Sequence, residues 1–247
     1  MKKLTSIAVS LILTTVMGTM IASDLYVPKV EEQVRPLAVV RRFKPEVLLE
    51  NGEKKFELDL TENLGERLYN GDTLSTSKGG YALVVFTDNS IAKVKPESML
   101  IVRGESLADS KVAKRQINLE AGEIFMEVEP QGSGSFDVAT SRSLASVKGT
   151  QFGTKAFGYI WVTEGQVDVT ALNSGQTVSL FEQMFASVDD SGNNIESGTL
   201  TEDELGDLNE GFNELDEDLI ERTIIIRFKD ANGQIREVPI IIFEKGN

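Results

Sequence analysis

The feature that most limits how this chain can fold is a long series of short apolar segments separated by tight turns. Between residues 68 and 188, segments of about four to seven residues end at turns built from glycine, aspartate or asparagine. In Tyr81–Phe86 both alternating faces are apolar, which indicates a buried strand, and Asp88-Asn89-Ser90 supplies the next turn. We therefore predict a mainly β fold: a single β-rich domain of short strands, an irregular β-solenoid or sandwich-like, with a C-terminal amphipathic helix and β-hairpin.

The first segment has the layout of a secretory signal peptide. Lys2 and Lys3 precede an uncharged, mostly apolar run over residues 4–22, and small residues lead to a cleavage site between Ser23 and Asp24. The alternative is an uncleaved anchor, since about 18 apolar residues just span a bilayer. Both interpretations place residues 24–247 outside the cytoplasm, because the positive end stays inside. The expected location is periplasmic or extracellular at the cell envelope. The protein would be anchored in the inner membrane if the N-terminal segment is not cleaved.

Composition removes several classes of function. The chain has no cysteine and no histidine, which excludes thiol chemistry, Ser-His-Asp catalysis and the usual zinc sites. The net charge of -14 argues against a nucleic-acid partner, because the field of the protein repels phosphates. We expect no cofactor, no metal site and no enzyme activity. One rival remains: a carboxylate-dependent glycan hydrolase using an acid pair such as Glu123 and Glu127, which would have to face each other across a cleft.

The chain divides into four parts by composition. Residues 1–23 form the signal peptide or anchor, and residues 24–46, with three prolines, form a spacer with an extended piece. Residues 47–190 form the β domain. Residues 191–247 form a tail of an acidic helix and a β-hairpin.

The tail carries two local signals. In residues 201–221, leucines and a phenylalanine recur at helical spacing, and Thr201 with Glu204 forms a capping box. Acidic groups here and in residues 189–197 leave calcium binding open, although neither stretch has EF-hand spacing. Residues 223–247 contain two apolar strands around an Asn-Gly turn, a hairpin that has to pair with a sheet or a partner.

Five segments, in order, resemble the FecR domain: GDTLSTSKGGYALVVFTDNSIAKVKPESMLIV, INLEAGEIFMEV, FDVAT, ASVKGTQFGT and VTEGQVDV. The resemblance covers about residues 65 to 190. Asn89 stands where the family usually has glycine, and asparagine tolerates the left-handed backbone next best. Each motif glycine is also explained as a turn requirement. The matching turn and strand positions are Gly71, Leu74, Thr76, Asp88, Ser90, Gly122, Phe136, Thr140, Gly149, Thr150, Phe152, Glu164, Gly165 and Val167.

The resemblance implies an exported domain that recognises another molecule. The best-known members are inner-membrane regulators with a cytoplasmic anti-sigma region, one spanning helix and this β domain in the periplasm. Here only Met1 to Lys3 precede the apolar segment, so we expect a stand-alone FecR-like protein without the anti-sigma region. The expected function is envelope sensing, signalling or protein-protein interaction, and the alternative is a structural or adhesive envelope scaffold.

The expected partner is an unidentified envelope or surface protein, or an envelope polymer. A membrane is a partner only through residues 4–22, if they are not cleaved. Trp161 lies in an apolar run, so it fits a core position as well as a recognition role. The candidate partner surface consists of Trp161, Phe212, Leu215, Ile224 and Ile226.

Overall fold

A computed structural model describes residues 35–52, 54–104, 114–130, 135–215, 219–229 and 233–245. The predicted signal peptide or anchor over residues 1–23, its cleavage site at Ser23 and Asp24, and residues 24–34 of the predicted spacer lie outside these residues. Residues 34–247 form one compact unit. Within the described part of the chain, no helix is both long and apolar enough to span a membrane.

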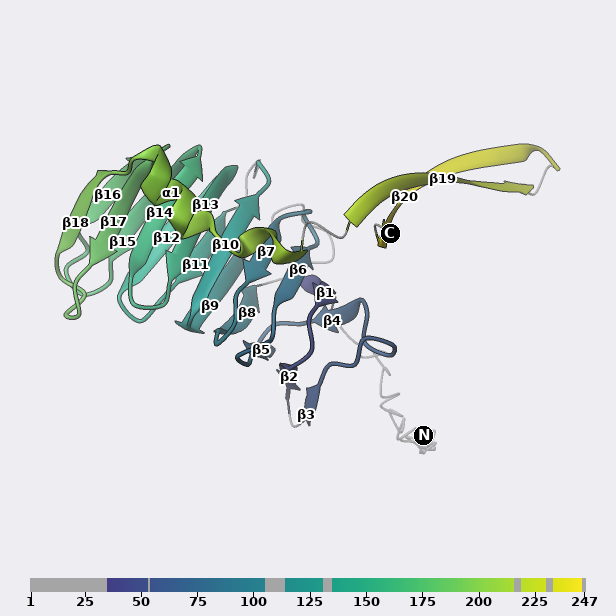
Figure 1. The fold of residues 1–247 in the computed structure, drawn as a ribbon, viewed down its shortest axis with the longest axis horizontal. Coiled ribbons are helices and arrows are strands. Elements are labelled where there is room, and N and C mark those ends of the chain that lie inside the picture. The colour runs from purple at the N-terminus through teal and green to yellow at the C-terminus, as the bar shows by residue number, and fades with distance from the viewer. Residues whose placement is uncertain are drawn as a thin grey trace, which may run out of the picture. The chain divides into compact units, whose positions relative to one another are not determined.

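Eighteen of the strands form two nine-stranded sheets (Figure 1). Sheet A contains, in spatial order, β4 (Glu66–Leu68), β1 (Ala38–Phe43), β6 (Ala82–Phe86), β7 (Ile91–Val94), β10 (Glu123–Val128), β13 (Thr150–Lys155), β14 (Tyr159–Glu164), β17 (Met184–Val188) and β18 (Ile195–Thr199). Sheet B contains β3 (Lys54–Glu57), β2 (Val47–Asn51), β5 (Thr73–Thr76), β8 (Met99–Gly104), β9 (Arg115–Ala121), β11 (Phe136–Ala139), β12 (Ser143–Val147), β15 (Gln166–Ala171) and β16 (Thr177–Phe181). The prediction of a mainly β fold of short strands is confirmed, and the two packed sheets correspond to the sandwich-like alternative.

The chain alternates between the sheets, mostly one hairpin at a time. The pairs β6–β7, β13–β14 and β17–β18 lie in sheet A, and β8–β9, β11–β12 and β15–β16 lie in sheet B. Strand β10 crosses to sheet A alone and pairs with β7 on one side and β13 on the other. Because the chain returns after a single strand, β9 and β11 run in the same direction, and they form a parallel pair in an otherwise antiparallel sandwich.

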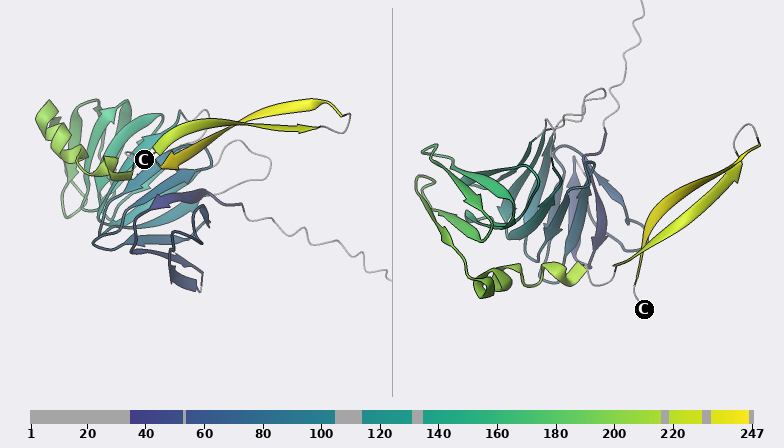
Figure 2. Two further views of the ribbon diagram at one scale, coloured as in Figure 1. Left: turned by 45° about the vertical axis from the view of Figure 1, so that its right-hand side comes forward. Right: turned by 90° about the horizontal axis from the view of Figure 1, so that it is seen from above.

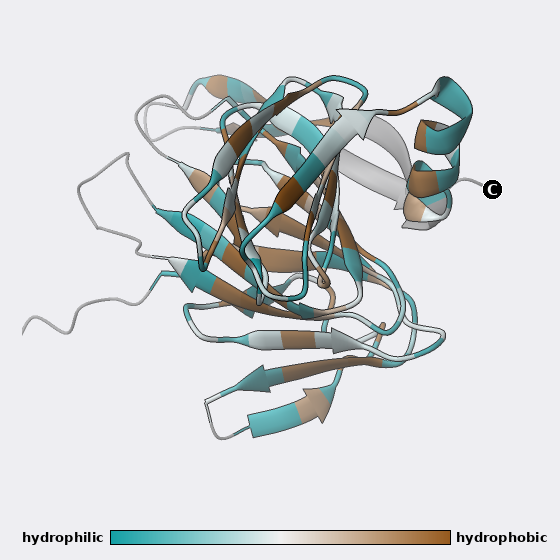
Figure 3. Cartoon of the chain, turned by 90° about the vertical axis from the view of Figure 1, so that its left-hand side faces the viewer, coloured by the Kyte–Doolittle hydropathy of each residue, from teal (hydrophilic) through white to brown (hydrophobic). Residues whose placement is uncertain are grey.

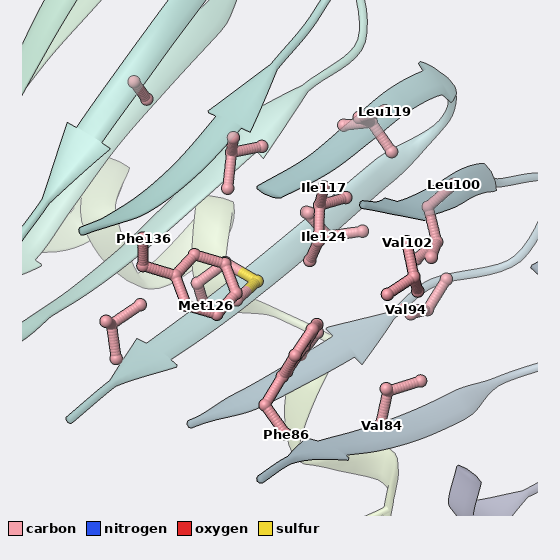
Figure 4. Packing of buried hydrophobic residues seen from close by; sticks show 14 of the residues in the cluster. Val84, Phe86, Val94, Leu100, Val102, Ile117, Leu119, Ile124, Met126 and Phe136 are labelled. Atoms are coloured by element: carbon pink, nitrogen blue, oxygen red, sulfur yellow. The ribbon is translucent and has the colours of Figure 1, made fainter. Parts of the chain in front are cut away.

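The core lies between the two sheets. Each strand turns alternate residues inward, so Val84 and Phe86 of β6 and Ile124 and Met126 of β10 are buried (Figure 4). Phe86 meets Phe136 of sheet B edge to face, with ring centroids 4.9 Å apart. Burying one large apolar side chain stabilises a fold by about 1.5–3 kcal/mol, so this continuous interior is the main source of stability.

The sandwich extends beyond the predicted limits of residues 47 and 190. Strand β1 pairs with β4 and β6, and its side chains Ala38, Val40 and Phe43 are buried. The extended piece expected within the spacer is thus strand β1, and a register shift between Val40 and Arg42 breaks its simple alternation. At the other end, β18 adds to sheet A beside β17.

The C-terminal region contains one α-helix, a short 3-10 helix and a hairpin. Helix α1 (Glu202–Asn209) begins at the predicted capping box of Thr201 and Glu204. It is shorter than predicted because Gly211, with φ 81°, turns the chain into the 3-10 helix η1 (Phe212–Leu215). The predicted hairpin is present as β19 (Leu219–Lys229) and β20 (Ile235–Lys245), which form a separate two-stranded sheet.

Candidate functional site

The motif glycines lie mainly where the chain crosses from one sheet to the other. Gly122 is the single residue between β9 and β10, and Gly165 is the single residue between β14 and β15. Both have positive φ, 78° and 87°. A Cβ on Gly165 would lie 2.8 Å from the carbonyl oxygen of Gly149, another crossing residue, so the corner has room only for glycine.

Motif hydroxyl groups form hydrogen bonds to the backbone near these corners and in the turn between β11 and β12. Thr76 donates from Oγ1 to the carbonyl oxygen of Lys95 at 2.6 Å and accepts from the amide of Ser98 at 3.0 Å. Thr150 Oγ1 donates to the carbonyl oxygen of Gln166 at 2.8 Å, and Thr140 Oγ1 accepts from the amide of Ser143 at 3.0 Å. These hydroxyls satisfy backbone groups that the sheets leave unpaired.

The turn between β6 and β7 is held in the same way. Asp88 accepts a hydrogen bond from the amide of Ser90. It also forms an ion pair with Arg115, whose Nη1 lies 3.1 Å from Asp88 Oδ2. The hydroxyl of Ser90 is buried and accepts the amide of Glu129 at 3.1 Å. Asn89 has φ 69°, the left-handed conformation expected where the family carries glycine.

The other motif positions have structural surroundings too. Leu74, Phe136, Phe152 and Val167 are buried in the core, Gly71 has φ 97°, and Glu164 is exposed at the end of β14. The motif residues are thus spread over corners and core, and they do not converge on one pocket.

The outer face of sheet A carries a second, separate apolar cluster. Its buried members are Phe125 of β10, Trp161 of β14, Leu200 and Phe212. We call residues 200–212 the C-terminal strap, because this segment packs over the aromatic residues of the sheet. Figure 2 shows helix α1 and the turn after it running alongside the sandwich. Gly153 of β13 lies opposite Trp161 in the register, and the indole fills the space where its side chain would be.

Polar contacts fix the strap in place. Trp161 Nε1 donates to Asn209 Oδ1 at 2.9 Å, and Lys95 Nζ lies 4.0 Å from the ring centre of Phe212, a cation–π distance. Burial, and then the charge of Glu204, raise the pKa of Tyr159 at the edge of the cluster. Hydrogen bonds from the backbone and side chain of Thr201 lower the pKa of the exposed Glu204.

The structure separates the five residues of the candidate partner surface. Trp161 of sheet A and Phe212 of the strap, at 0% and 4% exposure, are buried where the strap meets the sheet, so neither side chain is available at the surface. The side chain of Leu215 lies outside the described residues. Ile224 and Ile226 of β19 are exposed at 37% and 44%.

Sequence reasoning missed the partners that bury Trp161. Gly153 was assigned to a turn and Phe125 to a strand, and Asn209 had no assigned role, although all three surround the indole. A signal was available for the first, because a glycine inside a strand marks a site where another group approaches closely.

The outer face of sheet B has the opposite character. Its outward-facing residues on β9, β11, β12, β15 and β16 are partly or fully exposed and mostly polar. In Figure 3, hydrophilic and hydrophobic stretches alternate along the strands of the sandwich. Ser146 Oγ donates to Asp137 Oδ1 at 2.7 Å, and Ser179 Oγ donates to Asp168 Oδ1 at 2.6 Å across neighbouring strands. This face offers carboxylate and hydroxyl groups in fixed positions on a rigid sheet.

The acid pair proposed for a hydrolase is not brought together. Glu123 and Glu127 lie four residues apart on β10, roughly 13 Å along the strand. Glu123 is paired with Lys95 at 2.8 Å and with Lys155 at 3.4 Å, while Glu127 is paired with Lys93 at 2.6 Å. Hydrolytic carboxylate pairs are about 5–9.5 Å apart, so this pair does not fit that mechanism.

No metal-binding group of acids is found among the described residues. In the loop after β17, Asp189 accepts hydrogen bonds from Ser191, Asn193 and Asn194. These bonds hold the pKa of Asp189 well below its usual range, and the side-chain bond from Asn194 has the largest effect. The loop carboxylate thus serves a local turn.

A comparison with known protein families matches the part of the chain that carries most of the motif positions. The family described as FecR protein matches residues 72–168. The chain contains a FecR domain. It runs from just before β5 into β15, and so includes the central hairpins and both single-glycine corners at Gly122 and Gly165.

Two solved structures are similar to the chain, and no curated protein sequence matches it. They are crystal structures, at 1.65 and 2.50 Å resolution, of a candidate anti-sigma factor from Parabacteroides distasonis ATCC 8503. Each is 19% identical with a TM-score of 0.47, and the match covers 56% of this chain and 65% or 64% of the other. The chain therefore spans slightly less than two thirds of those chains.

Proposed function

We propose that this chain is an exported cell-envelope signalling protein whose FecR domain recognises another envelope protein. The observation that carries the proposal is the FecR match over residues 72–168, whose motifs build the corners of a rigid sandwich. Motifs that fix corners keep two broad sheet faces in place, and recognition sites are most precise on such rigid elements. The segment over residues 1–23, with its secretory layout, supports export.

The partner binds, in this proposal, at the outer face of sheet B. A sandwich offers two outer faces, and the C-terminal strap already covers the aromatic part of sheet A. On sheet B the outward residues Asp137, Ser146, Asp168 and Ser179 form cross-strand hydrogen-bonded pairs at or near the surface. This polar face suits a partner with basic or hydrogen-bonding groups, either a protein or an envelope polymer.

Two measurements test the proposal separately. For export, alkaline phosphatase fused to the C-terminus of the full chain is expected to be active, since it requires an oxidising compartment for its disulfides. The same fusion made with β-galactosidase is expected to be inactive. The reverse result would overturn the location.

For recognition, the full chain is used to capture envelope proteins from intact cells after cross-linking. Asp168→Arg reverses a charge on the face of sheet B, and Glu196→Arg reverses an exposed charge on β18 of sheet A as a matched control. We expect the captured partner to be lost with Asp168→Arg and kept with Glu196→Arg. Capture that survives both changes would contradict the sheet B site, and recovery of the chain alone would favour the structural scaffold.

A further inference from the structure

The hairpin of β19 and β20 has two edges of unequal character. The register pairs Ile225 with Pro239 and Thr223 with Ile241. Because proline has no N–H to give to a ladder, it occupies positions whose N–H side faces away from the neighbouring strand. Opposite residues in an antiparallel pair alternate between hydrogen-bonded and non-hydrogen-bonded. The odd-numbered residues of both strands therefore direct their backbone groups outward.

The outward edge of β20 is interrupted and that of β19 is not. On β20 the missing donor of Pro239 lies near the middle of the strand, which blocks the addition of another strand there. On β19 every outward-directed residue keeps its N–H, because none of the eleven residues is proline. Among the described residues no third strand pairs with either edge.

One face of this hairpin is apolar and exposed. Ile224, Ile226 and Phe228 share a face of β19, and Val238 lies opposite Ile226 on β20. Their exposed fractions are 37%, 44%, 48% and 43%. An isolated two-stranded hairpin is marginal in water, and stability requires further strands that widen the apolar face.

We propose that the free edge of β19 is a self-association site, where β19 of a second copy adds in antiparallel orientation to form a continuous four-stranded sheet. In the register that overlaps all eleven residues, Leu219 lies opposite Lys229 of the other copy and Ile224 lies on the two-fold axis. The same register puts Glu221 opposite Arg227, an acid opposite a base, and brings no two like charges together. The surface that joins the copies is thus self-complementary, as two-fold symmetry requires.

The size of the contact indicates a reversible dimer. An eleven-residue edge is about 37 Å long and a sheet about 10 Å thick, which gives roughly 370 Å² per copy. The total of about 740 Å² is below the roughly 1,200 Å² of stable specific complexes, so association depends on concentration. The hairpin carries nearly balanced charge in a chain of net charge -14, and the edge is therefore less repulsive than the rest of the molecule.

Single cysteines test the register, since the natural chain contains no cysteine. Ile224→Cys places a thiol on the two-fold axis in a non-hydrogen-bonded pair, where Cα atoms are about 4.5 Å apart, within disulfide range. Ile226→Cys is the matched control on the same face, but its copies lie about 14 Å apart. With mild oxidation of cells producing the full chain, we expect a disulfide dimer for Ile224→Cys, increasing with expression level, and little for Ile226→Cys.

Two proline substitutions test the edge. Thr223→Pro and Ile241→Pro change directly opposed residues that both direct their N–H outward, so each spares the β19–β20 ladder equally. Combined with Ile224→Cys, the first is expected to abolish the cross-link and the second to leave it, since Pro239 already blocks that edge. Equal cross-linking of both cysteines, no cross-link at Ile224→Cys, or the same response to both prolines would overturn the proposal.

Discussion

Replacing Gly153 with alanine is expected to release the C-terminal strap while leaving the sandwich folded. A Cβ at this position would come closer than 3 Å to three ring atoms of Trp161, whereas ordinary contacts are 3.4–4 Å. The indole has no room to retreat, because it is fully buried, packs near Phe212 and donates to Asn209. The ring must therefore leave its site or displace the strap.

The expected cost is about 3 kcal/mol. Overpacking a core typically costs 1–3 kcal/mol, and losing the burial of a tryptophan costs about 3–5 kcal/mol. The two ranges meet near 3 kcal/mol, since a rigid ring held from several sides cannot adapt by rotating a flexible chain. The loss is local, because Trp161 belongs to the outer cluster and not to the main core between the sheets.

Fluorescence measures this directly, since Trp161 is the single tryptophan of the chain. We expect a red-shifted emission for Gly153→Ala, with the far-ultraviolet circular dichroism of the β-sandwich preserved. Gly206→Ala is the control within the strap: no atom lies within 4 Å of the added Cβ, and alanine favours the helix by up to about 1 kcal/mol. Native emission and an unchanged denaturant midpoint in Gly153→Ala would refute the reasoning.

Three further predictions concern the corners, a turn and the helix cap. Gly122→Ala should destabilise the sandwich by about 3 kcal/mol or more in a urea titration, since the added Cβ collides with the backbone of Ser98 and the residue has positive φ. The control Gly175→Ala also has positive φ but open space around the Cβ, so it should cost about 1 kcal/mol in the same titration. Asn89→Val should cost about 1–2 kcal/mol at its φ of 69° while Asn89→Gly stays within about 0.5 kcal/mol, and equal midpoints would contradict the left-handed turn. The pKa of Glu204 is lowered in the folded protein, so the ionised carboxylate stabilises the docked strap. This stabilisation is fully present above the unfolded pKa of about 4.5 and is lost as the pH falls through the lower pKa of the folded state. Tryptophan emission followed from pH 6 to 3 should show this loss, and Glu204→Gln should remove the pH dependence.

The strand and turn pattern was predictable because local chemistry decides it. The turn at Asp88-Asn89-Ser90 and the capping box of Thr201 and Glu204 both formed as the residue types dictate. The apolar character of both faces of Tyr81–Phe86 also predicted burial correctly, with Ala82, Leu83, Val84 and Phe86 buried.

Long-range choices were not predictable from pattern alone. Nothing local assigns a hairpin to sheet A or sheet B, and the lone crossing of β10 that creates the parallel β9–β11 pair depends on the whole assembly. Trp161 had apolar neighbours on both sides, so the sequence left its surroundings undecided. Its partner Asn209 is 48 residues away and carries no sign of the contact. The bulge in β1 disturbs the period that identifies strands, so the sequence indicated an extended piece there but not its place in the sheet.

The alternation of hairpins between the two sheets has a consequence for the order of folding. Most strand pairs join neighbours in sequence or strands about 20–30 residues apart, so loop closure costs little at each step. A chain that emerges N-terminus first can complete each layer soon after its residues appear. The contacts of Phe125 with Phe212 and of Trp161 with Asn209 reach much further along the chain. We therefore expect the strap to close after the layers that it covers, so that burial of the indole reports that those layers have folded.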